Sequence, residues 1–223
     1  MDVVTYADQE MLAIDLANQI AGELTAALEH EDRVLMAVPG GTTPGPIFDD
    51  LCAADLDWSR VDVMLTDERW VPEDHERSNT RLIRERLLVD RAAAARYIPL
   101  YMPGDTPEER LADLETNIVP RLPISVLLLG MGADMHTASL FPGADKLAEA
   151  LDPDAPVLMP MRAPGAPEPR ITLTARVLDG ALSKHIVIFG EEKKAALEQA
   201  RKSKPFDAPV SAVLSETRVH WAP

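Results

Sequence analysis

The sequence predicts an α/β fold, a single domain whose mostly parallel sheet carries helices on both faces. Three apolar segments, RVLMAVPGG (33–41), ISVLLLGMG (124–132) and HIVIFG (185–190), do not alternate with polar residues, which indicates strands buried on both faces. Segments with helical character lie between them, and this interleaving is typical of parallel sheets. Residues 1–223 contain no repeat and no low-complexity block, so we expect one domain.

The first quarter of the chain is expected to form a helix, a strand and a second helix. Across residues 7–29 an apolar side chain recurs at every fourth position, which is the stripe of an amphipathic helix: Leu12, Leu16, Ile20, Leu24 and Leu28. The strand over 33–41 ends at a glycine turn. A helix over 42–53 follows, with Thr43 as its expected N-cap and Pro44 as its first residue.

The remaining elements alternate in the same way. In chain order we expect a buried strand over 61–70 that runs into a polar loop ending at Asn79, helices over 79–88 and 106–122, strands over 124–132, 170–174 and 185–190, a helix over 191–202 and a short strand over 218–222. The proline-rich residues 151–170 are interpreted as a surface excursion, because the strands after them are too short to form a core of their own.

Charge and cysteine content exclude several classes of function. The net charge of −15 argues against general binding to nucleic acid or to anionic membranes and indicates a solvated acidic surface. Any anionic ligand therefore needs a local binding site. Cys52 is the only cysteine, which rules out an intrachain disulfide and a cysteine zinc cluster. The N-terminus does not resemble a signal peptide and no apolar run approaches about 18 residues, so we expect a cytoplasmic protein.

Polar and glycine-rich segments follow four of the predicted strands. They read PGGTTP (39–44), TDERW (66–70), GMGADMH (130–136) and GEEKK (190–194). In open parallel sheets, ligands bind outside the carboxyl ends of the strands. The sequence therefore predicts a site at this edge.

The first of these segments is suited to an anion. Gly40 and Gly41 let backbone N–H groups point outward, and Thr42 and Thr43 add hydroxyl groups at a helix N-terminus. An ordinary strand-to-helix turn would also explain a lone glycine pair, and the nucleotide P-loop motif is missing. Cationic side chains from other segments make phosphate the better interpretation: Arg69, Arg170 and Lys193.

His136 is the candidate general base. It follows two glycines at a predicted strand end, and Asp67 or Asp134 could orient its ring. The alternative is a histidine that only caps a helix or packs in the core. Asp134 and His136 could also ligate a metal, but no third ligand lies nearby in sequence, so we expect no metal.

Three other motifs are weaker. GMGADM departs from the dinucleotide fingerprint, because Met135 stands where its third glycine belongs. TASLF lacks the G-x-S-x-G elbow of serine hydrolases. Lys193 or Lys194 could form a Schiff base with a sugar, although such lysines on a charged helix face are usually solvated.

Taken together, the motifs resemble those of 6-phosphogluconolactonases. GGTTP, LTDERWVPEDHERSN, LLLGMGADMHTASLFPG, PRITLT and FGEEK occur in that family's order and spacing, over residues 7 to about 200. The resemblance implies one α/β domain similar to glucosamine-6-phosphate and ribose-5-phosphate isomerases. It also implies hydrolysis of 6-phosphogluconolactone to 6-phosphogluconate in the oxidative pentose phosphate pathway, without metal or organic cofactor.

The resemblance also implies roles for individual residues. His136 would activate water for attack on the lactone carbonyl, and Asp67 and Asp134 would shape the pocket floor. The phosphate would be held by residues 40–43, Arg69, Arg170 and Lys193. One position departs from the family: its motif often reads Asp-Gly-His, whereas Met135 stands between Asp134 and His136 here. If this position needs a positive φ, the methionine is strained.

Two alternatives remain at this point. Glucosamine-6-phosphate deaminases share the Asp-Gly-His core, but their pattern continues into Asn-Glu-Pro, where this chain reads TASLFPG. A sugar-phosphate-binding regulator would usually add a helix-turn-helix segment or a basic patch, and neither is evident in the sequence. The expected partner is a small phosphosugar lactone, without nucleic acid or membrane.

Overall fold

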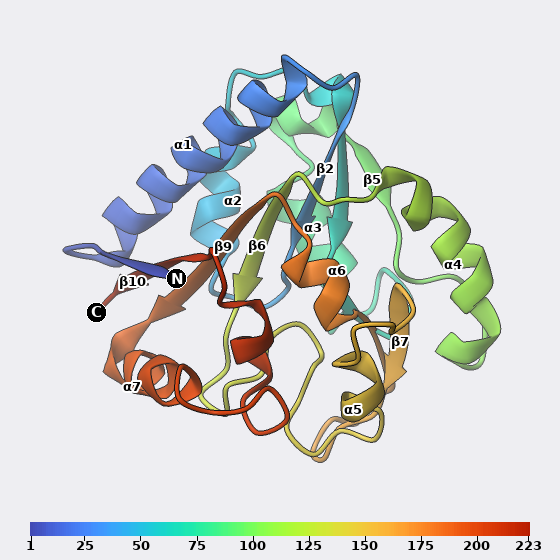
Figure 1. Ribbon diagram of the computed structural model, residues 1–223. Coiled ribbons are helices and arrows are strands. Elements are labelled where there is room, and N and C mark those ends of the chain that lie inside the picture. Colours follow the sequence, from blue (N-terminus) through green and yellow to red (C-terminus); the bar gives the residue numbers. More distant parts are fainter.

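The computed structural model describes all residues, 1–223, and its main sheet has the predicted architecture. Seven strands, all parallel, form this sheet (Figure 1). In spatial order they are β1 (Asp2–Thr5), β10 (Arg218–Ala222), β9 (Ser183–Phe189), β6 (Val126–Gly130), β2 (Val34–Val38), β3 (Val61–Leu65) and β5 (Arg96–Ile98).

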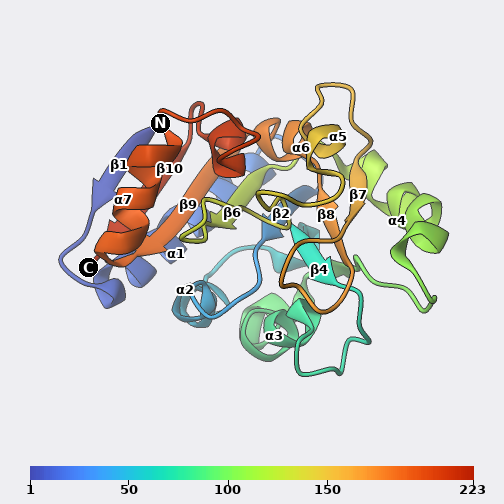
Figure 2. The ribbon, with the colours of Figure 1, turned by 90° about the horizontal axis from the view of Figure 1, so that it is seen from below.

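Helices cover both faces of this sheet, as Figure 2 shows. One face carries α1 (Gln9–Leu28), α2 (Gly45–Leu51) and α3 (Asn79–Arg86), and the other carries α6 (Ala175–Asp179) and α7 (Gly190–Ala200). α1 packs on β2, β6 and β10, whereas α7 packs on β9 and β10. The two remaining helices, α4 (Leu111–Ile118) and α5 (Leu147–Ala150), lie toward the small second sheet described below.

The longest helix, α1, forms as its sequence pattern predicts. Asp8 is its N-cap, and the Asp8 carboxylate accepts a hydrogen bond from the Met11 N–H at 2.8 Å. All five residues of the predicted apolar stripe are buried. No helix of the structure combines the length and the apolar character needed to cross a bilayer.

The segment predicted as one strand over 61–70 divides at Thr66. β3 stays in the parallel sheet, while β4 (Asp67–Arg69) pairs antiparallel with β8 (Arg170–Leu173). Thr66 joins the two sheets, because its N–H donates to Val38 O at 2.9 Å and its carbonyl accepts from Leu173 N at 2.9 Å. The residues after β3 are thereby redirected into a second sheet with the order β4-β8-β7.

Two sequence interpretations are wrong. Residues 151–170 are not only a surface excursion, because they contain β7 (Leu158–Met161), which is fully buried and pairs with β8. One cluster of 61 buried hydrophobic residues includes members of both sheets, so this segment is no linker. Thr43 is not an N-cap: α2 begins at Gly45, Pro44 takes the cap position, and no side chain caps the helix.

Candidate active site

The strand order places a crevice between β2 and β6. From β2 the chain continues to β3 and β5 on one side and then returns to β6 on the other. Such a reversal separates the loops that leave the carboxyl ends of the two adjacent strands, and ligands bind there in open α/β sheets. A cavity of about 280 Å³ lies at this point, at the end of the sheet that faces the viewer in Figure 2.

The cavity brings together most of the residues predicted from sequence. Those that line it are Gly40, Gly41, Thr42, Thr43, Asp67, Arg69, His136, Arg170 and Lys193. Asp134 does not line the cavity. The other lining residues are Pro39, Pro44, Asn79, Gly130, Met131, Gly132 and Ala138.

His136 is hydrogen-bonded to Asp134, which does not line the cavity. The Asp134 carboxylate lies 2.5 Å from His136 Nδ1 and also accepts the His136 backbone N–H at 3.2 Å. The hydrogen bond from His136 lowers the pKa of Asp134, so this carboxyl is ionised and Nδ1 carries the proton. That tautomer leaves the lone pair on Nε2. Phe141 packs against the ring with a centroid distance of 4.3 Å.

The glycine in front of this pair is required by close packing. A Cβ at Gly132 would lie 2.2 Å from His136 Nδ1 and 2.5 Å from Asp134 Oδ1. The Gly132 N–H donates to the His136 carbonyl at 3.0 Å, which closes the loop. The absence of a side chain at Gly132 therefore leaves the space that the His136–Asp134 pair occupies.

Met135 has the positive φ that its sequence position suggested. Its φ is +66°, and its N–H and carbonyl are bonded to Gly132 O at 2.9 Å and Val210 N at 3.0 Å. The left-handed region costs a residue with a Cβ about 1–2 kcal/mol, so the methionine is strained here. Its partly buried side chain packs against the hydrophobic core, which offsets some of this cost.

Asp67 lines the cavity and is fixed by hydrogen bonds. Its carboxylate accepts hydrogen bonds from Ser139 Oγ at 2.6 Å and from Thr66 Oγ1 at 3.1 Å. Arg170 Nη1 lies 4.0 Å from Asp67 Oδ2. The buried Asp67 carboxylate therefore lies among polar groups, with Arg170 close by.

Two arginines stand side by side in the cavity. Arg69 and Arg170 are register partners in the β4–β8 pair, and the Nε atom of each is buried without a hydrogen-bond partner. The guanidinium of Arg170 lies 5.1 Å from the Phe141 ring centroid, and burial lowers the pKa of Arg170. Adjacent cations with unused donors are suited to an anionic ligand.

The two lysines of α7 are in different environments. Lys193 lines the cavity. Lys194 instead lies over the Trp221 ring, 3.5 Å from its centroid, in a cation–π contact. Of the two, Lys193 is therefore the one placed to meet a ligand.

Sequence reasoning missed three supporting residues, Glu68, Asn79 and Ser139. Glu68 is fully buried and accepts the N–H groups of Asn79 and Thr80 at 2.9 and 2.8 Å, at the N-terminus of α3. Burial raises the pKa of Glu68 in spite of these hydrogen bonds. Asn79 donates from its side-chain amide to Asp67 O at 3.1 Å, so α3 is fastened to β4 beside the cavity. The N-cap residue Ser78, at the start of the predicted helix, could have indicated this junction.

The structure contains no group of three or more His, Cys, Asp or Glu side chains placed to hold a metal ion. Asp134 and His136 are therefore a pair without a third ligand of these types.

Comparisons with known proteins agree on one family. Residues 7–221 match the family model described as glucosamine-6-phosphate isomerases/6-phosphogluconolactonase. A Rhizobium meliloti protein named 6-phosphogluconolactonase is 41% identical over 225 positions, which cover 98% of this chain and 97% of that protein. A solved 6-phosphogluconolactonase structure from Shewanella baltica superposes with a TM-score of 0.96 at 32% identity, covering 100% of this chain and 98% of the other.

The fold extends to a second type of enzyme. A structure described as a monomeric glucosamine-6-phosphate deaminase superposes with a TM-score of 0.82, covering 100% of this chain and 97% of the other. At 16% identity this likeness concerns the fold alone.

Proposed function

The chain belongs to the glucosamine-6-phosphate isomerase/6-phosphogluconolactonase family, and we propose that it hydrolyses 6-phospho-D-glucono-1,5-lactone to 6-phospho-D-gluconate in the oxidative pentose phosphate pathway. The observation that carries this proposal is one cavity lined by both the Arg69–Arg170 pair and His136. In a phosphorylated lactone, the two arginines would bind the phosphate group, and His136 would supply the base for hydrolysis at the carbonyl. We place the reaction in the cytoplasm as part of this proposal.

The cationic side of the cavity would hold the phosphate. Arg69 and Arg170 offer guanidinium donors, Lys193 adds an ammonium group, and residues 40–43 add backbone N–H groups. Binding of the remote phosphate positions the lactone ring for attack and supplies binding energy for the reaction.

His136 would act as the general base. Its Nε2 accepts a proton from water while the water oxygen attacks the lactone carbonyl carbon. The imidazolium that forms is stabilised by the Asp134 carboxylate 2.5 Å from Nδ1. When the tetrahedral intermediate collapses, the bond between the carbonyl carbon and the ring oxygen breaks, and His136 returns the proton to the leaving oxygen. The product is a carboxylic acid, which then ionises.

Asp67 would shape and orient this site. Its carboxylate is already bonded to Ser139 and Thr66, so we assign it to the geometry of the pocket floor. Its proximity to Arg170 supports a role in fixing the guanidinium at the phosphate position.

The proposal is tested with fresh 6-phosphogluconolactone and with glucosamine 6-phosphate. Acid release from the lactone above an enzyme-free blank supports it, with phosphate-free gluconolactone as the control for phosphate dependence. Ammonia release from glucosamine 6-phosphate would instead indicate the deaminase, and binding without turnover would indicate a regulator.

A further inference from the structure

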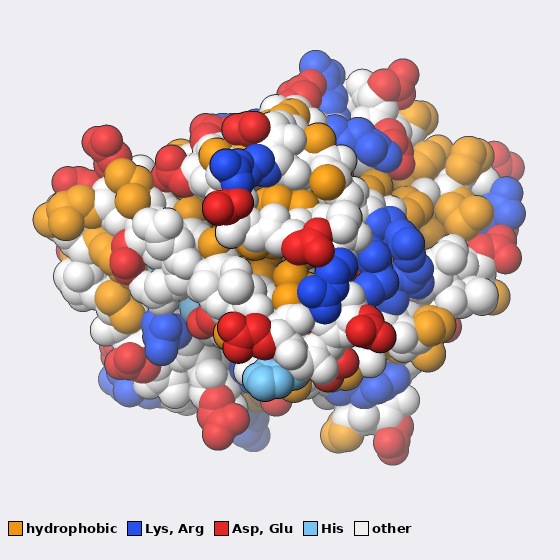
Figure 3. All heavy atoms as spheres, turned by 90° about the horizontal axis from the view of Figure 1, so that it is seen from above, with side chains coloured by type: hydrophobic (Ala, Val, Ile, Leu, Met, Phe, Trp, Pro, Cys, Tyr) orange, Lys and Arg blue, Asp and Glu red, His pale blue; other side chains and the backbone are white.

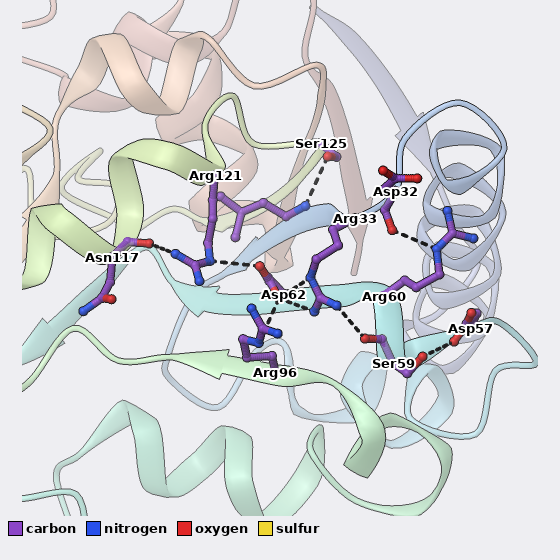
Figure 4. A network of polar contacts seen from close by, with 11 residues as sticks. Asp32, Arg33, Asp57, Ser59, Arg60, Asp62, Arg96, Asn117, Arg121 and Ser125 are labelled. Atoms are coloured by element: carbon purple, nitrogen blue, oxygen red, sulfur yellow. Dashed lines mark hydrogen bonds and ion pairs between the residues drawn. The ribbon is translucent and has the colours of Figure 1, made fainter.

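A second concentration of arginines lies at the opposite end of the parallel sheet, where the strands begin. Asp62 in β3 is buried there, and three arginines surround its carboxylate: Arg33, Arg96 and Arg121 (Figure 4). They come from three separate places in the chain, before β2, in β5 and after α4.

Two of the three arginines satisfy Asp62. Arg33 donates to Oδ1 from Nη2 at 2.5 Å and from Nε at 3.2 Å, while Arg121 donates to Oδ2 from Nε at 2.9 Å. Arg33 and Arg121 are also held by backbone carbonyls, of Ser59 and Asn117. The Arg96 Nε lies 3.9 Å from Oδ1, beyond hydrogen-bond distance, and the Arg96 side chain makes no hydrogen bond in the structure.

The cluster therefore has more positive charge than Asp62 balances. A single aspartate opposes three guanidinium groups, and the second carboxylate that lines this region, that of Glu31, still leaves a positive excess. This excess occurs in a protein with a net charge of −15. Guanidinium groups held close together repel one another, so an added anion would stabilise the arrangement.

The arginines open into a cavity of about 430 Å³. Its lining includes Arg33, Asp62, Arg96, Arg121, Ser125 and Leu182, and its volume lies within the usual range for small-ligand sites. Figure 3 shows the end of the molecule where the strands begin. Lys and Arg side chains form a group there, with single Asp and Glu side chains around it. The cavity is separate from the candidate active site, since the five-residue strands β2 and β3 lie between them, a length of about 17 Å.

We propose that this cavity, which we call the Asp62 cavity, binds the phosphate group of a small molecule. Guanidinium forks match phosphate oxygens in geometry and in charge. Arg96 is the residue free to make this contact, because its side chain is 55% exposed and Asp62 needs no hydrogen bond from it. Arg33 and Arg121, held in place by Asp62, add the electrostatic field that attracts the anion.

The test measures inorganic phosphate binding by calorimetry in a chain whose candidate active site has been disabled by Arg69→Ala and Arg170→Ala. This background is expected to keep one phosphate site. Adding Arg96→Gln should weaken that binding about 10-fold or more, as expected for loss of a charge-assisted contact. The matched control is Arg91→Gln: Arg91 is 54% exposed, pairs with Asp55 and does not line the cavity. It should leave the binding unchanged.

Absence of phosphate binding in the Arg69→Ala/Arg170→Ala chain would overturn the proposal, and so would binding that Arg96→Gln does not weaken. Arg96→Gln in the otherwise unaltered protein should keep normal turnover, which shows that the variant folds. A parallel titration with glucose 6-phosphate identifies the source of the phosphate. Tighter binding than that of inorganic phosphate indicates an organic ester, whereas equal binding indicates free phosphate.

Discussion

Replacement of Gly132 by alanine is expected to displace the His136–Asp134 pair and to slow the chemical step. The added Cβ would lie 2.2 Å from His136 Nδ1 and 2.5 Å from Asp134 Oδ1. Nonbonded atoms prefer separations of about 3.5 Å, so the imidazole has to move by more than about 1 Å. The ring is not free to move cheaply, because it packs on Phe141 and is bonded to Asp134.

A displacement of this size sets the expected magnitude. Misplacing a reacting group by about 1 Å can cost about 10²-fold in rate, and complete loss of a general base costs about 10²–10⁴-fold. We therefore expect Gly132→Ala to lower kcat about 10²-fold. KM should change only a few-fold, since Arg69 and Arg170 lie on other elements, β4 and β8, and the atoms nearest the added methyl group belong to His136 and Asp134.

The assay is the initial rate on fresh lactone, corrected for spontaneous opening, with a thermal melt to show that the variant is folded. Gly130→Ala is the comparison variant. Gly130 lines the same cavity, but a Cβ there meets no atom within 4 Å, so its kcat should fall far less. A folded Gly132→Ala enzyme with kcat within a few-fold of the unaltered protein would refute the close-packing argument.

Four further predictions concern His136, the two arginines of the cavity, metal dependence and His220. His136→Ala should lower kcat about 10²–10⁴-fold with little change in KM, and a folded variant with near-normal kcat would place the base elsewhere. Arg69→Ala or Arg170→Ala should weaken substrate binding by about 1.5–3 kcal/mol, measured as KM or product inhibition; unchanged kinetics in both would contradict the phosphate assignment. Activity should survive prolonged chelation, a prediction that rescue by zinc or magnesium would show to be wrong. Burial in β10 lowers the pKa of His220 to about 3, below the value of about 6.5 in the unfolded chain. Unfolding therefore takes up a proton between these values, and stability is lost as pH falls below about 6.5, by at most about 1.4 kcal/mol per pH unit from this group. Urea unfolding of His220→Gln should show a shallower pH dependence, and an equally steep one would contradict this origin.

The elements that are predictable from the sequence are those with a local signal. α1 has an apolar side chain at every fourth position. β2 and β6 are apolar and buried, and in β9 the apolar run extends from Ile186 to Phe189. Strands β1, β5 and β7 have only three or four residues, too few for a periodicity. β7 also contains Pro160, which its position at the edge of the small sheet tolerates.

The loops of the candidate site were predictable, but the bonds that hold them were not. Segments 39–44 and 130–136 each come directly after a predicted parallel strand. The carboxyl ends of parallel strands lie at one edge of the sheet, so the two loops were expected to meet there. The hydrogen bond between Ser139 and Asp67 joins residues 72 positions apart, and that between Asn79 and Asp67 crosses from α3 to β4. No local pattern specifies such contacts, because they depend on which elements become neighbours after folding.

The break at Thr66 links the fold to the chemistry. Once β4 leaves the parallel sheet, side chains along it alternate between two sides, so Asp67 and Arg69 line the cavity while Glu68 is buried beneath α3. Antiparallel pairing then sets Arg69 directly opposite Arg170, and like charges in that position destabilise a sheet. The arrangement is held by the remaining contacts of β4, which include the five hydrogen bonds that the Glu68 carboxylate accepts. An anion between the two guanidinium groups would remove the repulsion. Substrate phosphate is therefore expected to raise the stability of this small sheet as well as to occupy its cavity.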